Sequence, residues 1–294
     1  MFAMLKRNLL IYLRDRSAVF FSILSVLIAI GLYILFLAQS QVTAIGKAVE
    51  GSGIYYEDIN WLVNCWIISG LLSIIPVTSC LGVFGIMVED REKKITKDFK
   101  SAPVNPVRYP ILTMFSSGII GILMSLMAFV LYSLYIYMET GYTFDSIQVG
   151  KVFFLIILTT AISCTVMGFL VSFLKTSSSY RGMSVVIGTV IGFVNGVYVP
   201  AGEVPDTMRL LIKMIPFSHT AVIFRKVLME NAIEAVFGQI KTEAVQNYKL
   251  FYGIDYIMND KVLTVKASLL YVALFSIFAF FLYLVRSKNK AREY

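Results

Sequence analysis

Charge is scarce in this sequence: Asp, Glu, Lys and Arg make up only 15% of its 294 residues, whereas 58% are hydrophobic. Soluble globular domains carry roughly 25% charged residues, so this composition indicates a protein that folds in lipid. The apolar residues form long uncharged runs and lack the alternation of membrane barrel strands. Because lipid offers no hydrogen-bond partner to the backbone, such runs must be helices. The sequence therefore predicts an all-α membrane protein.

Residues that carry chemistry are equally few. There is one histidine, His219, and no Gly-x-x-x-x-Gly-Lys-Ser/Thr loop to bind nucleotide phosphates. The three cysteines lie in apolar runs, and Cys65 and Cys80 would be about 22 Å apart on one helix, too far for a disulfide. No acidic or histidine cluster has metal-ligand spacing. We expect no catalytic site, metal or cofactor in this chain, and for His219 a structural or helix-capping role, with ligand binding as the alternative.

Six apolar runs are predicted to cross the membrane. They cover residues 17–38, 59–88, 109–138, 152–174, 182–199 and 262–285. A hydrocarbon core of about 30 Å requires roughly 20 helical residues, so the fifth run is marginal by its length alone. Its crossing follows from the orientation of the chain ends.

Lysine and arginine are distributed unevenly among the segments between these runs. Residues 1–16, 89–108 and 286–294 hold four, six and four of them, whereas 39–58 and 139–151 hold one each. Basic residues favour the cytoplasmic side of a membrane, so both termini are predicted to be cytoplasmic. Two cytoplasmic ends require an even number of spans, so the fifth run must cross. The net charge of +8 is explained in this way, without nucleic-acid binding.

This topology predicts a plasma-membrane, multi-pass protein in five parts. They are an interfacial elbow helix (1–16), five transmembrane helices with a cytoplasmic coupling loop at 89–108 (17–199), an external segment (200–261), a sixth transmembrane helix (262–285) and a cytoplasmic tail (286–294). In the external segment, 207–215 and 217–229 look like two short helices separated by Pro216. They are too short to span and too apolar to lie free in water. A re-entrant hairpin between helices five and six, followed by a small cap, fits both properties.

The loop 89–108 carries one narrow apolar stripe on a highly charged helix. Ile95, Phe99 and Ala102 recur at helical spacing. Such a helix suits insertion into a groove on a soluble partner. The alternative is a basic helix on anionic lipid, which the four acidic residues of the segment disfavour. The candidate coupling residues are Arg91, Glu92, Lys93, Lys94, Ile95, Lys97, Asp98 and Phe99.

Small residues recur every fourth position on two predicted helices. Such faces let helices approach closely in a membrane, and glycines can also give a helix mobility during gating. The candidate packing or gating residues are Ser184, Gly188, Gly192 and Gly196 in the fifth run, and Ser117, Gly121 and Ser125 in the third.

The central portions of all six runs carry no charged residue. Carriers driven by protons or ions place charged groups inside the membrane to bind the coupling ion. Coupling to an ion gradient is therefore not expected, and energy must enter elsewhere or the protein is passive.

Three stretches resemble permeases of the type-2 ABC exporter family, and the resemblance covers essentially the whole chain. Arg7-Asn-Leu-Leu-Ile-Tyr-Leu-Arg-Asp-Arg-Ser is similar to their elbow helix, and Glu89-Asp-Arg-Glu-Lys-Lys-Ile with Ser101-Ala-Pro103 to their coupling segment. The order of prolines, His219 and an arginine after the fifth run is similar to their fifth span and external hairpin. These hairpin residues are Pro200, Pro205, Pro216, His219 and Arg225.

The resemblance implies two permeases, either two copies or a pair of homologues, working with two cytoplasmic ATP-binding-cassette ATPases that hold ATP and Mg. It also implies that residues 91–99 contact the ATPase. The chain departs from the family pattern at Lys93-Lys94-Ile95, where many relatives carry a Gly-Thr pair.

An uncharged interior whose polar groups are mostly hydroxyls, with Asn64 and Asn195 as exceptions, suits an apolar cargo more than an ion. The favoured function is export of an amphiphilic or hydrophobic compound, such as a drug, antimicrobial peptide, lipid or glycolipid, with drug or antibiotic resistance as one outcome. The alternatives are ABC-driven ion or polysaccharide export, or a passive channel. Membrane lipid is an expected partner, and nucleic acid is not.

Overall fold

The computed structural model describes residues 2–15, 31, 39–48, 54–95, 107–238, 242–258 and 261–292. Its elements in chain order are α1 (Phe2–Arg14), α3 (Gln39–Ala48), α4 (Tyr56–Glu92), α6 (Arg108–Thr140), α7 (Ser146–Val171), α8 (Ser177–Val194), η2 (Ala201–Glu203), α9 (Asp206–Met214), α10 (Pro216–Leu228), α11 (Glu230–Phe237), α12 (Thr242–Phe251), β1 (Ile257–Met258), β2 (Lys261–Val262) and α13 (Val265–Arg292). The short antiparallel pair β1–β2, with Ile257 opposite Val262, is the one departure from the all-α prediction within these residues.

Four of these helices are long and apolar enough to cross a membrane: α4, α6, α7 and α13. They coincide with four of the six predicted runs. The predicted first run, 17–38, lies outside the described residues except for Gly31. The fifth run corresponds to α8, whose 18 residues include Arg181 and do not reach the same length and hydropathy. The described part of the chain therefore has four candidate membrane spans. The total of six spans stays a prediction.

The predicted limits of the fifth run are wrong by five residues at each end. α8 covers 177–194 and not 182–199. It begins early because the Thr176 hydroxyl accepts a hydrogen bond from the Ser179 amide, 3.3 Å away, which caps the helix. It ends early because Gly196 adopts a left-handed φ of 60°, a conformation typical of glycine after a helix C-terminus.

Two other helices run further than the sequence predicts. α4 continues through residue 92, so it includes the start of the predicted coupling loop. α13 continues through Arg292, so the predicted tail is part of the last helix as far as that residue. The extension of α4 carries Arg91 and that of α13 carries both Lys and Arg, which are good helix formers. Neither contains the glycine or proline that would end a helix.

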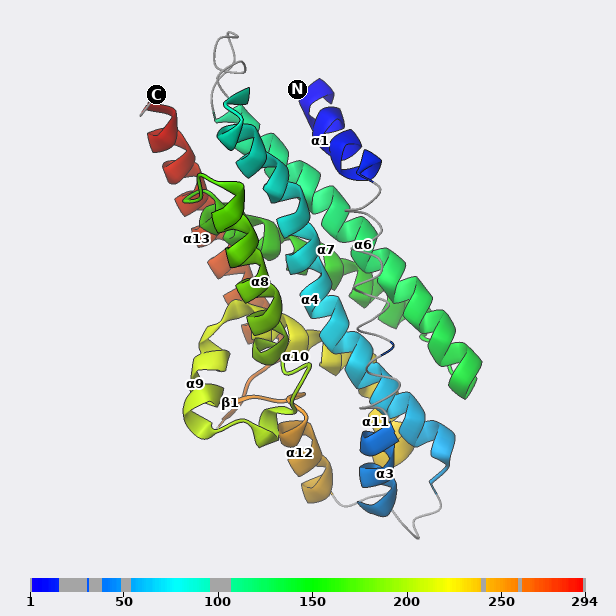
Figure 1. The fold of residues 1–294 in the computed structure, drawn as a ribbon. Coiled ribbons are helices and arrows are strands. Elements are labelled where there is room, and N and C mark those ends of the chain that lie inside the picture. Colours follow the sequence, from blue (N-terminus) through cyan, green and yellow to red (C-terminus); the bar gives the residue numbers. More distant parts are fainter. Residues whose placement is uncertain are drawn as a thin grey trace.

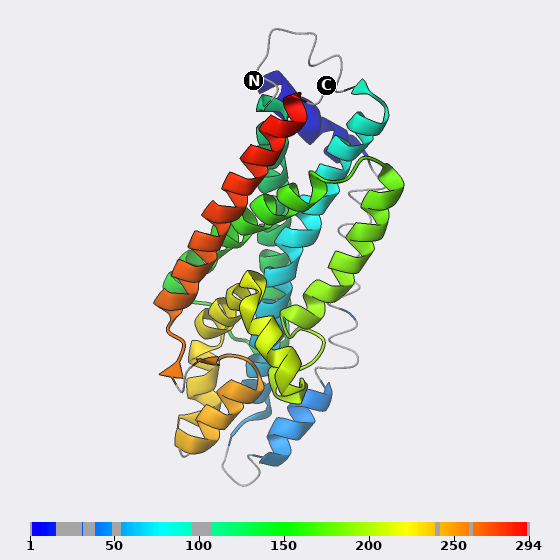
Figure 2. The same ribbon diagram turned by 90° about the vertical axis from the view of Figure 1, so that its left-hand side faces the viewer.

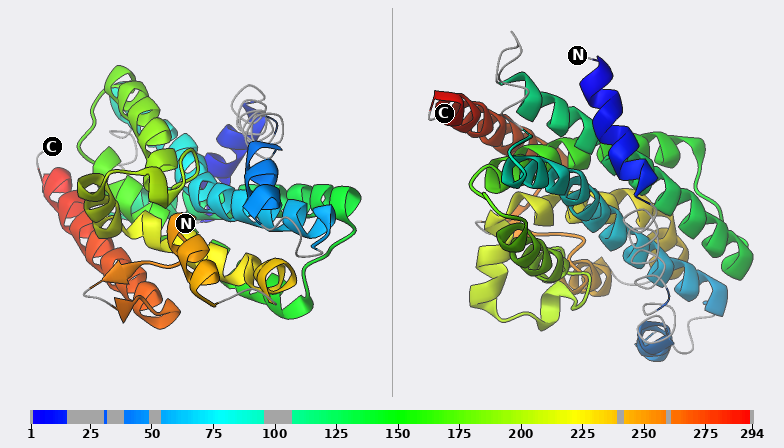
Figure 3. Two further views of the ribbon diagram at one scale, coloured as in Figure 1. Left: turned by 90° about the horizontal axis from the view of Figure 1, so that it is seen from below. Right: turned by 45° about the horizontal axis from the view of Figure 1, so that its top comes forward.

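α4 is the central helix of the bundle. Its 37 residues make about 55 Å of helix, and it packs against α6, α7, α8 and α10. Both ends of the described chain lie at one end of the bundle, which we call the terminal end (Figure 1). α3, α9, α12 and the β1–β2 pair lie at the opposite end, the hairpin end (Figure 2). Figure 3 shows α1 crossing α4 and α6 at the terminal end.

α10 lies inside the bundle and packs against α4, α7 and α13. It is buried around its whole circumference, with Ala221, Phe224 and Arg225 each at most 1% exposed. Pro216 is its first residue, a position where the missing amide hydrogen costs nothing. The helices α9 and α10 agree with the two short helices predicted between residues 207 and 229, and Pro216 begins the second of them.

Candidate functional site

The last three residues of α4, 90–92, lie at the terminal end, and each of these charged residues binds a different neighbour. Asp90 is 4% exposed. Its two carboxylate oxygens accept hydrogen bonds from the two terminal nitrogens of Arg7, each at 2.8 Å, and one oxygen accepts a further bond from the Tyr109 hydroxyl. Paired hydrogen bonds between arginine and carboxylate are strong and directional. Asp90 therefore joins α4 to α1 and to the start of α6.

Arg91 and Glu92 hold the turn between α7 and α8. Arg91 donates to the backbone carbonyls of Val171 and Leu174, at 3.2 and 3.5 Å. Glu92 accepts from both the amide, at 3.0 Å, and the hydroxyl of Ser177. The cation thus lies at the C-terminal end of α7 and the anion at the N-terminal end of α8, which are the charges that the two helix dipoles favour. We call residues 90–92 the α4 clamp.

The structure describes five of the eight predicted coupling residues, and these five form two groups. Arg91 and Glu92 belong to the α4 clamp and bind their own chain, because the α7–α8 turn ends within reach of them. Lys93 forms an exposed ion pair with Glu89 at 2.6 Å, and Lys94, with a φ of 61°, ends the helical geometry just before Ile95. The remaining three, Lys97, Asp98 and Phe99, lie outside the described residues.

The small-residue face of α6 lies in the interior. Ser117 and Ser125 are fully buried, and Ser117 donates to the backbone carbonyl of Cys80 on α4 at 3.0 Å. A methyl group added to Gly121 would lie 2.8 Å from the Thr160 methyl of α7 and 3.2 Å from the Cys80 sulfur. These three predicted residues therefore lie together where α6 meets α4 and α7.

The small residues of the fifth run are not brought together in the same way. Ser184 is partly exposed, and a side chain at Gly188 would meet nothing within 4 Å. A side chain at Gly192 would collide with the Tyr198 ring of the following turn, not with another helix. Gly196 lies beyond the end of α8 and has a left-handed backbone conformation, so it is not on the same helical face as the other three residues.

The prolines and the histidine of the predicted hairpin stabilise the ends of its helices. Pro200 and Pro205 immediately precede η2 and α9. The His219 ring, 4% exposed, is 2.8 Å from the carbonyl oxygen of Lys213 in the last turn of α9. Its other nitrogen is 3.4 Å from the Ser268 hydroxyl of α13. Burial lowers the pKa of His219, so the neutral ring joins α9, α10 and α13.

Arg225 is the largest fully buried side chain among the described residues and is 1% exposed. One terminal nitrogen donates to the carbonyls of Asn195 and Gly196 at 2.8 and 2.7 Å, and the other to that of Gly253 at 3.2 Å. The guanidinium carbon lies 5.2 Å from the centre of the Trp66 ring, a favourable cation–π distance. Arg225 therefore joins α10 to the end of α8, the turn after α12, and α4.

Sequence reasoning missed Asp90, Tyr109 and Trp66. Asp90 lies near the start of the charged loop 89–108, and Tyr109 follows its end. The two carboxylates directly after an apolar run, Glu89 and Asp90, were the one available signal of an ionic contact at the end of α4. No local signal pairs Trp66 with Arg225, because 159 residues separate them. Among the described residues, no group of three or more His, Cys, Asp or Glu side chains could hold a metal ion.

The described residues form four membrane-length helices around a buried hairpin helix and contain no metal-binding cluster. This arrangement is that of a helical membrane protein, and the contacts of its candidate site join one helix to another. Over residues 39–285 the chain matches the family described as ABC-2 family transporter protein. Because this match covers most of the chain, the protein belongs to that family. It is thus an ABC transporter permease, and the family implies a partnership with an ABC ATPase subunit. No individually curated protein matches the sequence.

Proposed function

We propose that this permease exports an amphiphilic or hydrophobic compound from the cell. The energy comes from separate ATP-binding-cassette subunits that bind ATP and Mg. The spans described for the protein keep charged side chains near their ends, so their central portions give an ion no partner. The buried polar groups within them are mainly hydroxyls, for example Ser117, Ser125 and Thr160.

The α4 clamp is the observation that carries this proposal. The predicted docking segment follows α4 directly, and residues 90–92 bind α1, α6, α7 and α8. A displacement of that segment by an ATPase therefore reaches four neighbouring helices through side-chain contacts. A passive channel has no need of such a connection to a cytoplasmic loop.

The proposed orientation places the terminal end in the cytoplasm. Both described chain ends lie at this end (Figure 1), in agreement with an even number of spans. The fourteen basic residues of segments 1–16, 89–108 and 286–294 favour the cytoplasmic side. The full topology has six spans, with the α9–α10 hairpin entering the membrane from the outside, and the active assembly contains a second permease, either another copy or a homologue.

Transport measured in inside-out vesicles tests the proposal. The permease is co-expressed with its partner ATP-binding-cassette ATPase, and ATP-dependent accumulation of a fluorescent amphiphilic dye is recorded. Glu92→Ala is expected to leave the ATPase bound but to lower dye accumulation, because the Ser177 amide and hydroxyl at the start of α8 lose their acceptor on α4. Lys93→Ala is the matched control, since its exposed ion pair with Glu89, one helical turn away, joins α4 to no other helix.

Phe99→Asp separates docking from transmission. Phe99 is the largest apolar residue of the predicted stripe, and a carboxylate buried in a partner groove would cost several kcal/mol. This variant should lose the ATPase during purification, whereas Glu92→Ala should retain it. Equal accumulation by Glu92→Ala, Lys93→Ala and the parent protein would refute transmission through the α4 clamp. Dye movement that is independent of ATP would refute the exporter.

A further inference from the structure

A cavity of about 570 Å³ lies at the hairpin end, where α7, α10, α11 and α13 meet the turn after α12. Its volume is within the range of small-molecule sites, roughly 300–1,000 Å³. Buried apolar side chains from three elements form its floor: Leu155, Ile223 and Ile254, each at most 4% exposed. Phe154 also lines the cavity and is 58% exposed, so the cavity is open along α7.

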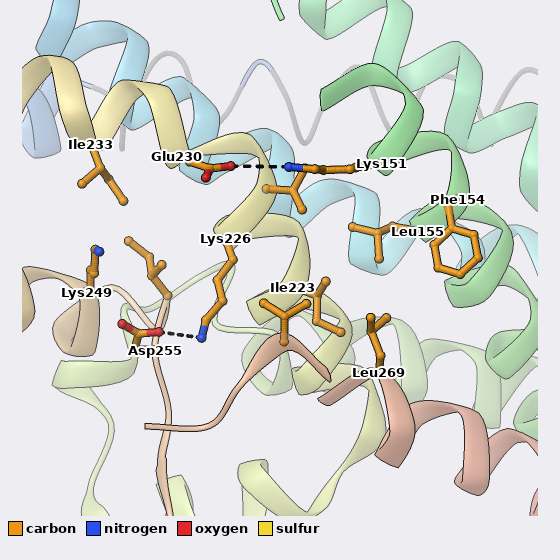
Figure 4. A pocket seen from close by; sticks show the side chains of 13 residues that line it. Lys151, Phe154, Leu155, Ile223, Lys226, Glu230, Ile233, Lys249, Asp255 and Leu269 are labelled. Atoms are coloured by element: carbon orange, nitrogen blue, oxygen red, sulfur yellow. Dashed lines mark ion pairs between the residues drawn. The ribbon is translucent and has the colours of Figure 1, made fainter. Parts of the chain in front are cut away.

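Charged side chains gather on one side of this cavity (Figure 4). Lys226 of α10 pairs with Asp255 at 2.6 Å, and Lys151 of α7 pairs with Glu230 of α11 at 3.7 Å. A third lysine, Lys249 of α12, also lines the cavity. Two ion pairs neutralise four of these five charges.

Lys249 is the remaining charge. It has no acidic partner within 4 Å among the described residues, and its backbone is fixed beside the cavity. The carbonyl of Lys249 accepts hydrogen bonds from the amides of Ile254 and Asp255, at 2.8 and 3.1 Å. Gly253, with a φ of 65°, makes the reversal that closes this turn. The same turn thus positions an unneutralised ammonium, a carboxylate and part of the apolar floor.

We propose that this cavity binds an anionic phospholipid of the surrounding bilayer. The apolar floor takes an acyl chain that enters beside Phe154, and the phosphate lies against the Lys249 ammonium. A single phosphate matches the single excess positive charge, whereas a zwitterionic headgroup brings a second cation into contact with the lysines. That the lipid comes from the outer leaflet rests on the orientation proposed above, but the binding itself does not.

Photocrosslinking of the purified full-length permease tests this site without the ATPase. The protein is placed in nanodiscs that contain phosphatidylglycerol or phosphatidylcholine with a diazirine at the end of one acyl chain. Labelled peptides are identified by mass spectrometry. Phosphatidylglycerol should label the peptides around Phe154 and Leu269, and phosphatidylcholine should label them at least fivefold less.

Three variants isolate the charge. A lysine near a lipid phosphate contributes a factor of roughly five to affinity, so Lys249→Gln should weaken phosphatidylglycerol binding roughly fivefold. Lys249→Glu also adds repulsion and should weaken it roughly thirtyfold. Lys261→Glu is the matched control, because Lys261 is an exposed residue of β2 at the same end and does not line the cavity.

Thermal unfolding of every variant shows whether it is folded, and Lys249→Arg supplies a charge-retaining check that should bind like the parent. Equal labelling by the two lipids, or parental binding by Lys249→Glu, would overturn the proposal. Labelling confined to other peptides would do the same. Because ATP and the ATPase are absent, a negative result here leaves the proposed export function intact, and a failure of dye transport leaves this site intact.

Discussion

Replacing Arg225 by methionine should destabilise the protein more than any single substitution of an exposed charge. Methionine fills a similar volume but donates no hydrogen bond, so the carbonyls of Asn195, Gly196 and Gly253 lose the partner that the guanidinium provides. Leaving one buried polar group unsatisfied costs about 1–3 kcal/mol. Part of this cost is recovered because the buried charge no longer has to be desolvated. A net loss of about 3–5 kcal/mol is expected from these opposing contributions.

The thermal unfolding temperature of the purified permease in one detergent measures this loss, with proteolysis of the α9–α10 hairpin as a second measurement. Arg181→Met is the matched control, because Arg181 is exposed on α8 and should change the unfolding temperature little. Arg225→Lys should be intermediate: an ammonium keeps the charge but cannot reproduce the planar fork of donors. If Arg225→Met unfolds at the temperature of Arg181→Met, Arg225 does not join α8, α10 and α12.

Three further results are expected. Gly121→Val should destabilise the protein by about 1–3 kcal/mol through overpacking. Gly188→Val places its side chain in open space within this chain and should not destabilise it. Equal stability of the two variants in chemical denaturation would contradict the packing of α6. Mild oxidation should join Cys80 and Cys164, whose sulfurs are 3.2 Å apart, in an intramolecular disulfide between α4 and α7, and two thiols that stay titratable would contradict that contact. Burial lowers the pKa of His219. Its contribution to stability is therefore present above the unfolded pKa of about 6.5 and is lost as pH falls below that value. His219→Gln should make the unfolding temperature depend less on pH between pH 7.5 and 5, and an unchanged pH dependence would assign the effect to other groups.

The sequence predicts the membrane helices well where composition alone decides them. α4, α6, α7 and α13 are long uncharged runs, and their helical structure follows from the need to satisfy backbone groups in lipid. Their ends are harder to predict, because caps decide them: Thr176 begins α8 before its apolar residues start. The left-handed Gly196 ends it while apolar residues continue.

The sequence predicted where the candidate site lies in the chain, but not which residues contact one another there. The charge distribution located the loop after α4 and made Arg91 and Glu92 candidates for ATPase contact, which stays a prediction. It could not predict their contacts with the α7–α8 turn, about 80 residues away in sequence. Such a contact depends on how α4, α7 and α8 pack against one another. The residue pattern within one helix carries no information about that packing. The same reason explains why Arg225 could be singled out while its Trp66 partner could not.

α4 is fixed near both of its ends. At the terminal end Asp90 is bound by Arg7 and Tyr109, and at the hairpin end Asp58 is bound by Tyr142. These two carboxylates are 32 residues apart, about 48 Å along the helix axis, and both are largely buried. Sliding of α4 along its own axis would break both contacts at once. α4 is therefore held in register along its axis, against α1 and α6 at the terminal end and against the α6–α7 turn at the hairpin end.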